Sequence, residues 1–376
     1  KPEVSIVICP RPARAVTSMT PGKAQVPGTE TPHESASAGA QPGIHPEGQT
    51  TRVAFLGPQG TFTEQALQQM IAAGYLPGST EGIDVKSPSA ALEAVRNHSV
   101  DYACVALESS VDGPIAQTED ALTMGSPLII VREVLVPVEF SILVRPGATT
   151  EDVQTFTTHP AAEAQTRSWV QQHLPNAQFV PASSNGAAAQ AVAEGRADAA
   201  AAPARAGQIH KLESLAEAVA DVRGAYTRFV LVSRPSQVTP KTGNDRTGVA
   251  FTLENKPSGL LDALAELSVR GIDMSRISSR PTREAMGTYY FHLGLVGHLE
   301  DEAMAEALAG LYRSTSSLRF LGSWPRAELP GAGVGKEQDA HHPPAGTFPP
   351  DYSESRGWVA ELKQQTQPPA QQQTKG

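Results

Sequence analysis

The sequence is poor in cysteine and has no long uninterrupted apolar run, and each shortage excludes a class of protein. Cys9 and Cys104 are the only cysteines among 376 residues, so we expect no disulfide framework, which fits a reducing cytoplasm. The longest apolar stretch, PLIIVREVLVPVEFSILV, contains Arg132, Glu133 and Glu139 and is not expected to span a membrane. A net charge of −9 disfavours binding to nucleic acid or to an anionic membrane.

Several sequence motifs of catalysis are also missing. The ten histidines show neither HExxH nor cysteine-rich spacing, which disfavours a metal site. The GxSxG motif of serine hydrolases is absent, and the loop GPQGTF matches neither GxGxxG nor the Walker A spacing. We therefore expect a cytoplasmic protein that works without metal or cofactor.

The chain divides into two ends without periodicity and a patterned middle. Residues 1–50 and 327–376 are rich in small and polar residues and in proline, which predicts disorder, apart from a short helix within 353–365. Between the ends, short apolar runs alternate with segments of helical spacing. This alternation predicts α/β layers with a largely parallel sheet, in which a second lobe (137–219) is inserted into a first lobe (51–136 with 220–235). Ligands of such sheets bind in a cleft near helix N-termini.

A second module follows over residues 247–326. Its strands and helices follow the order βαββαβ, which is the ferredoxin-like arrangement. An edge strand of such a sheet is a natural pairing surface, so we expect self-association through it.

Four short motifs lie where strands meet helices or loops. GPQGTFTEQAL offers backbone N–H groups to an anion, although Thr61 and Glu64 are equally typical of a capping box. ALESSVDGP ends a strand with polar side chains. In TTHPAAEAQ, His159 suits a general acid or an anion donor, but its place before a helix favours a cap. YTRFVLV puts Thr227 and Arg228 at the start of a buried strand.

These motifs, in this order from Arg52 to Pro325, resemble the bacterial prephenate dehydratase family with its C-terminal ACT regulatory domain. The motifs NKPSGLL and ISSRPTR of the second module belong to the same resemblance. The resemblance implies a two-lobed catalytic domain of the periplasmic-binding-protein type (type II). It also implies conversion of prephenate to phenylpyruvate, CO2 and water without a cofactor, feedback inhibition by phenylalanine, and a homodimer or homotetramer.

The resemblance also implies roles for particular residues. Thr227 is the expected catalytic residue. The expected substrate-binding residues are Thr61, Phe62, Glu108, Ser109, Ser110, Thr158, His159, Gln165, Arg228 and Phe229. The expected effector-binding residues are Ser258, Gly259, Leu260, Ser278, Ser279, Arg280 and Pro281. Ser109 stands where the family usually has asparagine, and the effector motifs also depart from the family pattern, which predicts an altered response to phenylalanine.

The chemistry of prephenate agrees with this assignment. Its ring becomes aromatic when CO2 and hydroxide leave, so the protein has to hold a dianion and stabilise the departing oxygen. We expect Thr227 to donate a hydrogen bond or a proton to that oxygen, and Arg228 to grip a carboxylate. Two alternatives stay open: an arogenate dehydratase, and a non-catalytic sensor with the same fold. Removal of the residues after about 240 is expected to leave an active enzyme that ignores phenylalanine.

Overall fold

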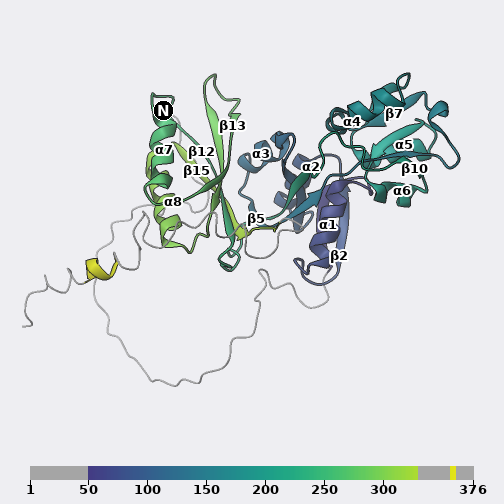
Figure 1. The fold of residues 1–376 in the computed structure, drawn as a ribbon. Helices are drawn as coiled ribbons and strands as arrows, with labels where there is room; N and C mark the ends of the chain where they lie inside the picture. Colours follow the sequence, from purple (N-terminus) through teal and green to yellow (C-terminus); the bar gives the residue numbers. More distant parts are fainter. Residues whose placement is uncertain (1–49, 329–355, 361–376) are drawn as a thin grey trace, which may run out of the picture.

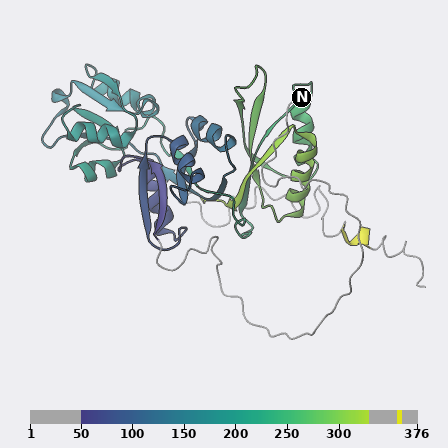
Figure 2. The same ribbon diagram turned by 180° about the vertical axis from the view of Figure 1, so that it is seen from behind.

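The computed structural model describes residues 50–328 and 356–360, and the folded part forms three bodies in a row (Figures 1 and 2). Lobe I lies in the middle. Its sheet has the order β2-β1-β3-β11-β5, with β4 paired to β3. The strands are β1 (Thr51–Leu56), β2 (Thr80–Val85), β3 (Tyr102–Ser109), β4 (Gly113–Pro114), β5 (Ile129–Pro137) and β11 (Tyr226–Ser233). The helices are α1 (Phe62–Ala72), α2 (Pro88–Arg96) and α3 (Ala116–Thr123).

Apolar side chains from both faces of this sheet form two cores. On one face, Phe229 and Val136 pack with Leu67 of α1. On the other face, Val230 packs with Leu92 of α2 and with residues of α3. Neighbouring residues of β11 therefore point to opposite faces, as the alternation of a strand requires.

Lobe II is built between β5 and β11. Its sheet has the order β10-β6-β9-β7-β8. The strands are β6 (Ser141–Val144), β7 (Thr155–Thr158), β8 (Gln178–Pro181), β9 (Ala199–Ala202) and β10 (Glu213–Ala216). The helices are the short η1 (Thr150–Asp152), α4 (Pro160–His173), α5 (Asn185–Ala193) and α6 (Ala204–His210). The chain enters lobe II after Pro137 and returns to lobe I at Tyr226.

The prediction of a largely parallel sheet is wrong for part of each lobe. In lobe I, β1 pairs in parallel with β2 and β3, but β11 runs antiparallel to both β3 and β5. β11 follows lobe II in the chain and lies between β3 and β5. Its direction is set by the path of the chain through lobe II and not by a strand-helix-strand unit. The predictions also omit α3, α6 and β10, which are short and lack side-chain caps or strong periodicity.

The C-terminal domain has the predicted βαββαβ order. Its antiparallel sheet, β13-β14-β12-β15, has two helices on one face. The elements are β12 (Asp245–Thr252), α7 (Gly259–Ser268), β13 (Met274–Pro281), β14 (Tyr289–Val296), α8 (Glu302–Ser314) and β15 (Ser317–Pro325). Residues 356–360, within the predicted tail helix, are helical; the segments predicted to be disordered lie largely outside the described residues.

The other face of this sheet packs on lobe I. Leu321 and Trp324 of β15 belong to the same core cluster as Leu92 of lobe I, and Trp324 is 1% exposed. Gly322 has a φ of +120°, and a Cβ added there would lie 2.3 Å from the carbonyl oxygen of Ile130 in β5. Lobe I and the C-terminal domain thus share a continuous core. Among the described residues, no helix is both long and apolar enough to cross a membrane.

Candidate active site

Thr227 lies near the start of β11, where the chain returns from lobe II. Its backbone is opposite Ser109 of β3 and Val136 of β5, and its side chain is on the face of the sheet that α1 covers. The side chain is half-buried. Within the described residues the Thr227 hydroxyl makes no hydrogen bond to another protein group. The hydroxyl is therefore not used within the described part of the protein, and its predicted contact with substrate stays a prediction.

The loop after β3 supplies polar groups beside Thr227. The Ser110 hydroxyl accepts a hydrogen bond from the backbone N–H of Tyr226 at 2.9 Å, so this loop holds the start of β11. The Ser109 hydroxyl accepts from the N–H of Asp112 at 3.1 Å and shapes the turn. Asp112 in turn accepts a hydrogen bond from the Gln165 amide of α4 at 2.7 Å. Three predicted residues, Ser109, Ser110 and Gln165, thus lie at one junction between the lobes.

A second set of contacts joins the lobes at the loop after β1. The Ser184 hydroxyl donates to the carbonyl oxygen of Gly57 at 3.1 Å. A Cβ on Gly186 would lie only 2.8 Å from the carbonyl oxygen of Gln59, so this close approach requires glycine. Arg205 of α6 donates to the Glu64 carboxylate of α1 at 2.9 Å. We call the set of segments 57–61, 109–112, 158–160, 184–186 and 225–227 the lobe junction.

The first turns of three helices face the lobe junction. The N-cap residues of α1, α4 and α5 are Thr61, His159 and Ser184. Asn185, the first residue of α5, donates to the Thr158 hydroxyl at 3.0 Å, which places α5 beside the start of α4. Helix N-termini carry a partial positive charge and free N–H groups, so this arrangement favours an anionic ligand.

Two predicted substrate-binding hydroxyls are used within the protein. Thr61 donates to the carbonyl oxygen of Leu56 at 2.9 Å and accepts from the N–H of Glu64 at 3.1 Å, so its predicted role as an N-cap is confirmed. The Glu64 carboxylate accepts from the N–H of Gly60 at 2.8 Å and not from that of Thr61, so the reciprocal bond of a capping box is not made. Thr158 is fully buried and donates to the carbonyl oxygen of Ala201 at 2.7 Å. Both residues shape the lobe junction, and the structure gives neither hydroxyl a free face.

The aromatic residues divide between the core and the lobe junction. Phe229 is 2% exposed inside lobe I, which differs from its predicted contact with substrate. Phe62 is partly buried, packs against the cores of both lobes and meets Phe140 edge to face with ring centroids 5.5 Å apart. Phe62 therefore has the better position of the two to touch a ring-shaped ligand.

His159 caps α4, as the residue pattern favours. Its Nδ1 accepts a hydrogen bond from the N–H of Ala161 at 3.2 Å. Partial burial lowers the pKa of His159, and the nearby Asp112 carboxylate opposes this shift. Because the net direction is downward, the ring is neutral at neutral pH, and its second nitrogen suits hydrogen bonding better than charge neutralisation.

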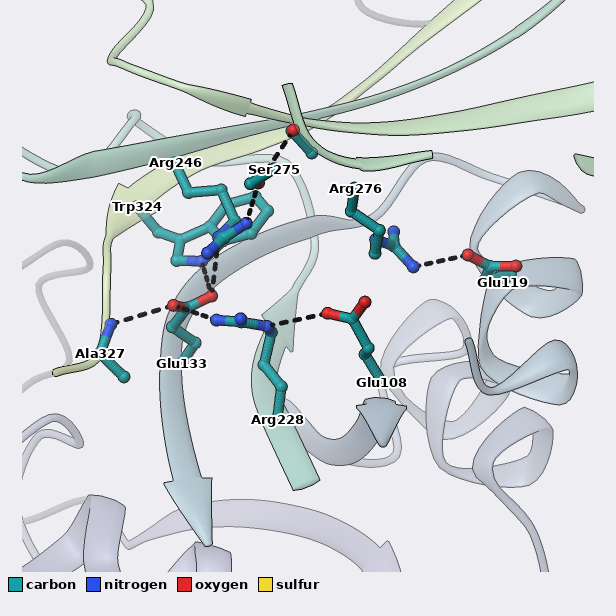
Figure 3. A network of polar contacts seen from close by, with 10 residues as sticks. Glu108, Glu119, Glu133, Arg228, Arg246, Ser275, Arg276, Trp324 and Ala327 are labelled. Atoms are coloured by element: carbon teal, nitrogen blue, oxygen red, sulfur yellow. Dashed lines mark hydrogen bonds and ion pairs between the residues drawn. The ribbon is translucent and has the colours of Figure 1, made fainter. Parts of the chain in front are cut away.

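Arg228 contacts protein carboxylates, which differs from the predicted grip on a substrate carboxylate. It points to the opposite face of the sheet from Thr227, toward the C-terminal domain (Figure 3). Its Nη1 donates to Glu133 at 2.6 Å, and its Nε lies 3.4 Å from a Glu108 oxygen. The guanidinium is thus already paired with two carboxylates. Glu108, a predicted substrate-binding residue, forms an ion pair with Arg228 in this structure.

The predicted effector residues fall into two groups. Ser258, Gly259 and Leu260 begin α7, and Ser258 has a φ of +64°. The second group lies along β13 (278–281). Ser278 donates to Glu119 at 2.6 Å, and Arg280 donates to Asp120 at 2.9 and 3.1 Å. These two side chains bind α3 of lobe I, whereas Ser279 and Pro281 alternate with them and are exposed.

Acid is expected to weaken the contact between lobe I and the C-terminal domain. His292 of β14 is fully buried beside Arg276, Arg280 and Asp120, and burial lowers its pKa to about 3. Between pH 6.5 and 3 the unfolded chain binds a proton at this position that the folded chain does not, so stability falls as the pH decreases. At pH 5 the loss is on the order of 2 kcal/mol.

Thermal unfolding at pH 7 and pH 5 checks this expectation. His292→Phe should flatten the decline between these two values, because the Glu133 and Asp120 carboxylates, whose pKa values are lowered from 4.5 and 3.8, lose their contribution only at lower pH. An equal decline in both proteins would contradict the role of His292.

Sequence reasoning missed several residues that build this region. Asp112 and Arg205 join the lobes, and Asn185 holds α5 beside the start of α4 within lobe II. Nothing local distinguishes these three from other polar loop or helix residues. Glu133 did carry a signal, because it is a carboxylate inside the apolar run IIVREVLVP. A buried carboxylate needs partners, and these partners are distant in the sequence.

Comparison with known proteins gives one consistent family. A family model described as "Prephenate dehydratase" matches residues 53–237. The prephenate dehydratase of Corynebacterium glutamicum is 50% identical over 281 residues, which are 74% of this chain and 89% of that protein.

Two solved structures are also similar. A prephenate dehydratase from Arthrobacter aurescens, in complex with L-Phe, has a TM-score of 0.70 and 39% identity over 84% of this chain and 100% of that chain. A protein described as a novel type of quorum quenching acylase has a TM-score of 0.62 and 29% identity over 73% of this chain and 97% of that chain.

Proposed function

The chain belongs to the prephenate dehydratase family, and we propose that it converts prephenate to phenylpyruvate, CO2 and water at the lobe junction. The observation that carries the proposal is the Thr227 hydroxyl, which has no partner among residues 50–328 and 356–360 and lies beside a junction where the first turns of three helices meet. The two relatives named prephenate dehydratase, at 50% and 39% identity, are more similar to this chain than the acylase at 29%.

The junction suits the charges of this substrate. Prephenate brings two carboxylates, and N–H groups at the starts of α1, α4 and α5 favour anions. Gln165 and the neutral ring of His159 add hydrogen-bonding groups on the side of lobe II. Thr227 then donates to the ring oxygen as it leaves with the bonding electrons, while the carboxylate carbon leaves as CO2 and its electrons complete the aromatic ring. Enclosure between the lobes strengthens each of these interactions.

Incubation of the purified full-length chain with prephenate tests the proposal. We expect phenylpyruvate to form, and we expect a parallel reaction with arogenate to be slower. Faster formation of phenylalanine from arogenate would make the chain an arogenate dehydratase. Binding of prephenate without product would instead indicate a sensor, and both results would overturn the proposal as stated.

We propose further that phenylalanine binds the C-terminal domain and regulates turnover, and that the protein forms homodimers or homotetramers. Two observations support this: a relative of 39% identity was solved with L-Phe, and β13 is an edge strand of the C-terminal sheet with Ile277 44% exposed. Edge strands of this kind pair with a second copy. Light scattering measures the oligomeric state, and a comparison with and without phenylalanine shows whether phenylalanine changes it.

A further inference from the structure

A buried carboxylate connects the strand of Thr227 to the C-terminal domain (Figure 3). The side chain of Glu133 in β5 is 0% exposed. Its Oε1 accepts hydrogen bonds from Arg228 at 2.6 Å and from the N–H of Ala327 at 2.9 Å. Its Oε2 accepts from the indole N–H of Trp324 at 2.8 Å and lies 3.3 Å from Nε of Arg246. Three of these four partners come from β12, β15 or the residues just after β15.

The fourth partner, Arg228, is the neighbour of Thr227. The pairing of β11 with β3 changes register between Arg228 and Phe229, so the ladder to β3 is irregular at this point. On the other side of β11 the ladder to β5, the strand of Glu133, keeps its register from Tyr226 to Leu231. The ion pair between Arg228 and the buried Glu133 supplies an additional restraint next to Thr227.

We propose that Glu133 is a positioning residue for the reaction, which holds Arg228, and thereby the backbone of Thr227, in a way that depends on docking of the C-terminal domain. The inference rests on the proposed function, in which Thr227 acts on the substrate. If the C-terminal domain shifts, Glu133 loses the N–H groups of Trp324 and Ala327 and the charge of Arg246. A buried carboxylate without partners is strongly unfavourable, so Glu133 and Arg228 rearrange together.

The coupling acts in both directions. Any ligand that changes the docking of the C-terminal domain changes the placement of Thr227, and any ligand that fixes Thr227 changes the docking by the same free energy. The arrangement thus provides a physical route for coupling through packed and hydrogen-bonded side chains.

β15, the strand of Trp324, makes a second contact with lobe I. This contact allows the positioning role of Glu133 to be distinguished from a general contribution to the stability of the domain interface. Arg319 of β15 donates from Nη1 and Nη2 to the carbonyl oxygens of Leu122, Met124 and Gly125, at 3.0, 3.2 and 3.0 Å. These bonds join the C-terminal domain to the end of α3 and make no contact with β11 or Glu133. Arg319→Met therefore weakens the same interface without altering the restraint on Thr227.

The experiment compares Trp324→Phe with Arg319→Met in the full-length chain. We expect both variants to unfold at a lower temperature. Trp324→Phe alone should speed amide hydrogen exchange in residues 226–229 and lower kcat by about 3- to 30-fold with KM within about twofold. Glu133→Asp keeps the charge but shortens the side chain, and we expect it to have the same selective effect on exchange and kcat. It serves as the test variant if Trp324→Phe folds poorly.

Equal exchange in residues 226–229 and equal kcat in the wild type, Trp324→Phe and Glu133→Asp would overturn the inference. Equal effects of Trp324→Phe and Arg319→Met would also overturn it, because the interface as a whole would then explain the result. Absence of phenylpyruvate with the wild type would instead reject the proposed function, and the exchange comparison would still decide whether Glu133 restrains β11.

Discussion

Replacement of Thr227 by alanine is expected to lower kcat on prephenate at least about 100-fold, the lower limit for loss of a general acid. The physical reason is that the hydroxyl has no protein partner in the described residues and lies beside three helix N-termini. Its removal therefore costs transition-state stabilisation and leaves no protein group unsatisfied. We expect the unfolding temperature to change little and KM to change less than kcat.

Two further variants at this position define the result. Thr227→Ser keeps the hydroxyl and should retain most of the turnover, whereas Thr227→Val keeps the shape without the hydroxyl and should resemble alanine. Steady-state rates of phenylpyruvate formation, together with thermal unfolding, measure both properties. Turnover of the alanine variant within about threefold of the wild type would remove Thr227 from the mechanism.

The sequence predicted local structure well where local forces decide it. Ser87 and Pro88 start α2 as expected, because an N-cap and a proline at the first turn act within a few residues. The βαββαβ order of the C-terminal domain was also predicted correctly, because the spacing of apolar residues indicates each of its strands and helices. The motif around Thr227 was correctly placed on a strand, β11.

The direction of side chains at the site was not predictable from the same patterns. Alternation along β11 requires Thr227 and Arg228 to point to opposite faces, but it does not say which face meets lobe II and which meets the C-terminal domain. That depends on the strand order of the whole sheet. The carboxylate that binds Arg228 is 95 residues away, and the indole that shares it is 191 residues from Glu133.

The shared core also changes what is expected of a chain that ends at residue 240. From the sequence, such a truncation should leave an active enzyme without regulation. In the structure it removes Leu321 and Trp324 from the core of lobe I, and loss of a buried tryptophan alone costs about 3–5 kcal/mol. It also takes Arg246 and the N–H groups of Trp324 and Ala327 from Glu133.

We therefore expect the chain ending at residue 240 to be strongly destabilised, with a lower unfolding temperature, poor solubility and reduced kcat on prephenate. A chain ending at residue 328 is the matched control, because it lacks the following residues but keeps every partner of Glu133 described above. Thermal unfolding and turnover of the two chains measure the difference. If the shorter chain unfolds cooperatively at the temperature of the longer one and forms phenylpyruvate at the same rate, lobe I does not depend on the C-terminal domain. That result would also contradict the inference that the restraint of Glu133 on Thr227 depends on docking of the C-terminal domain.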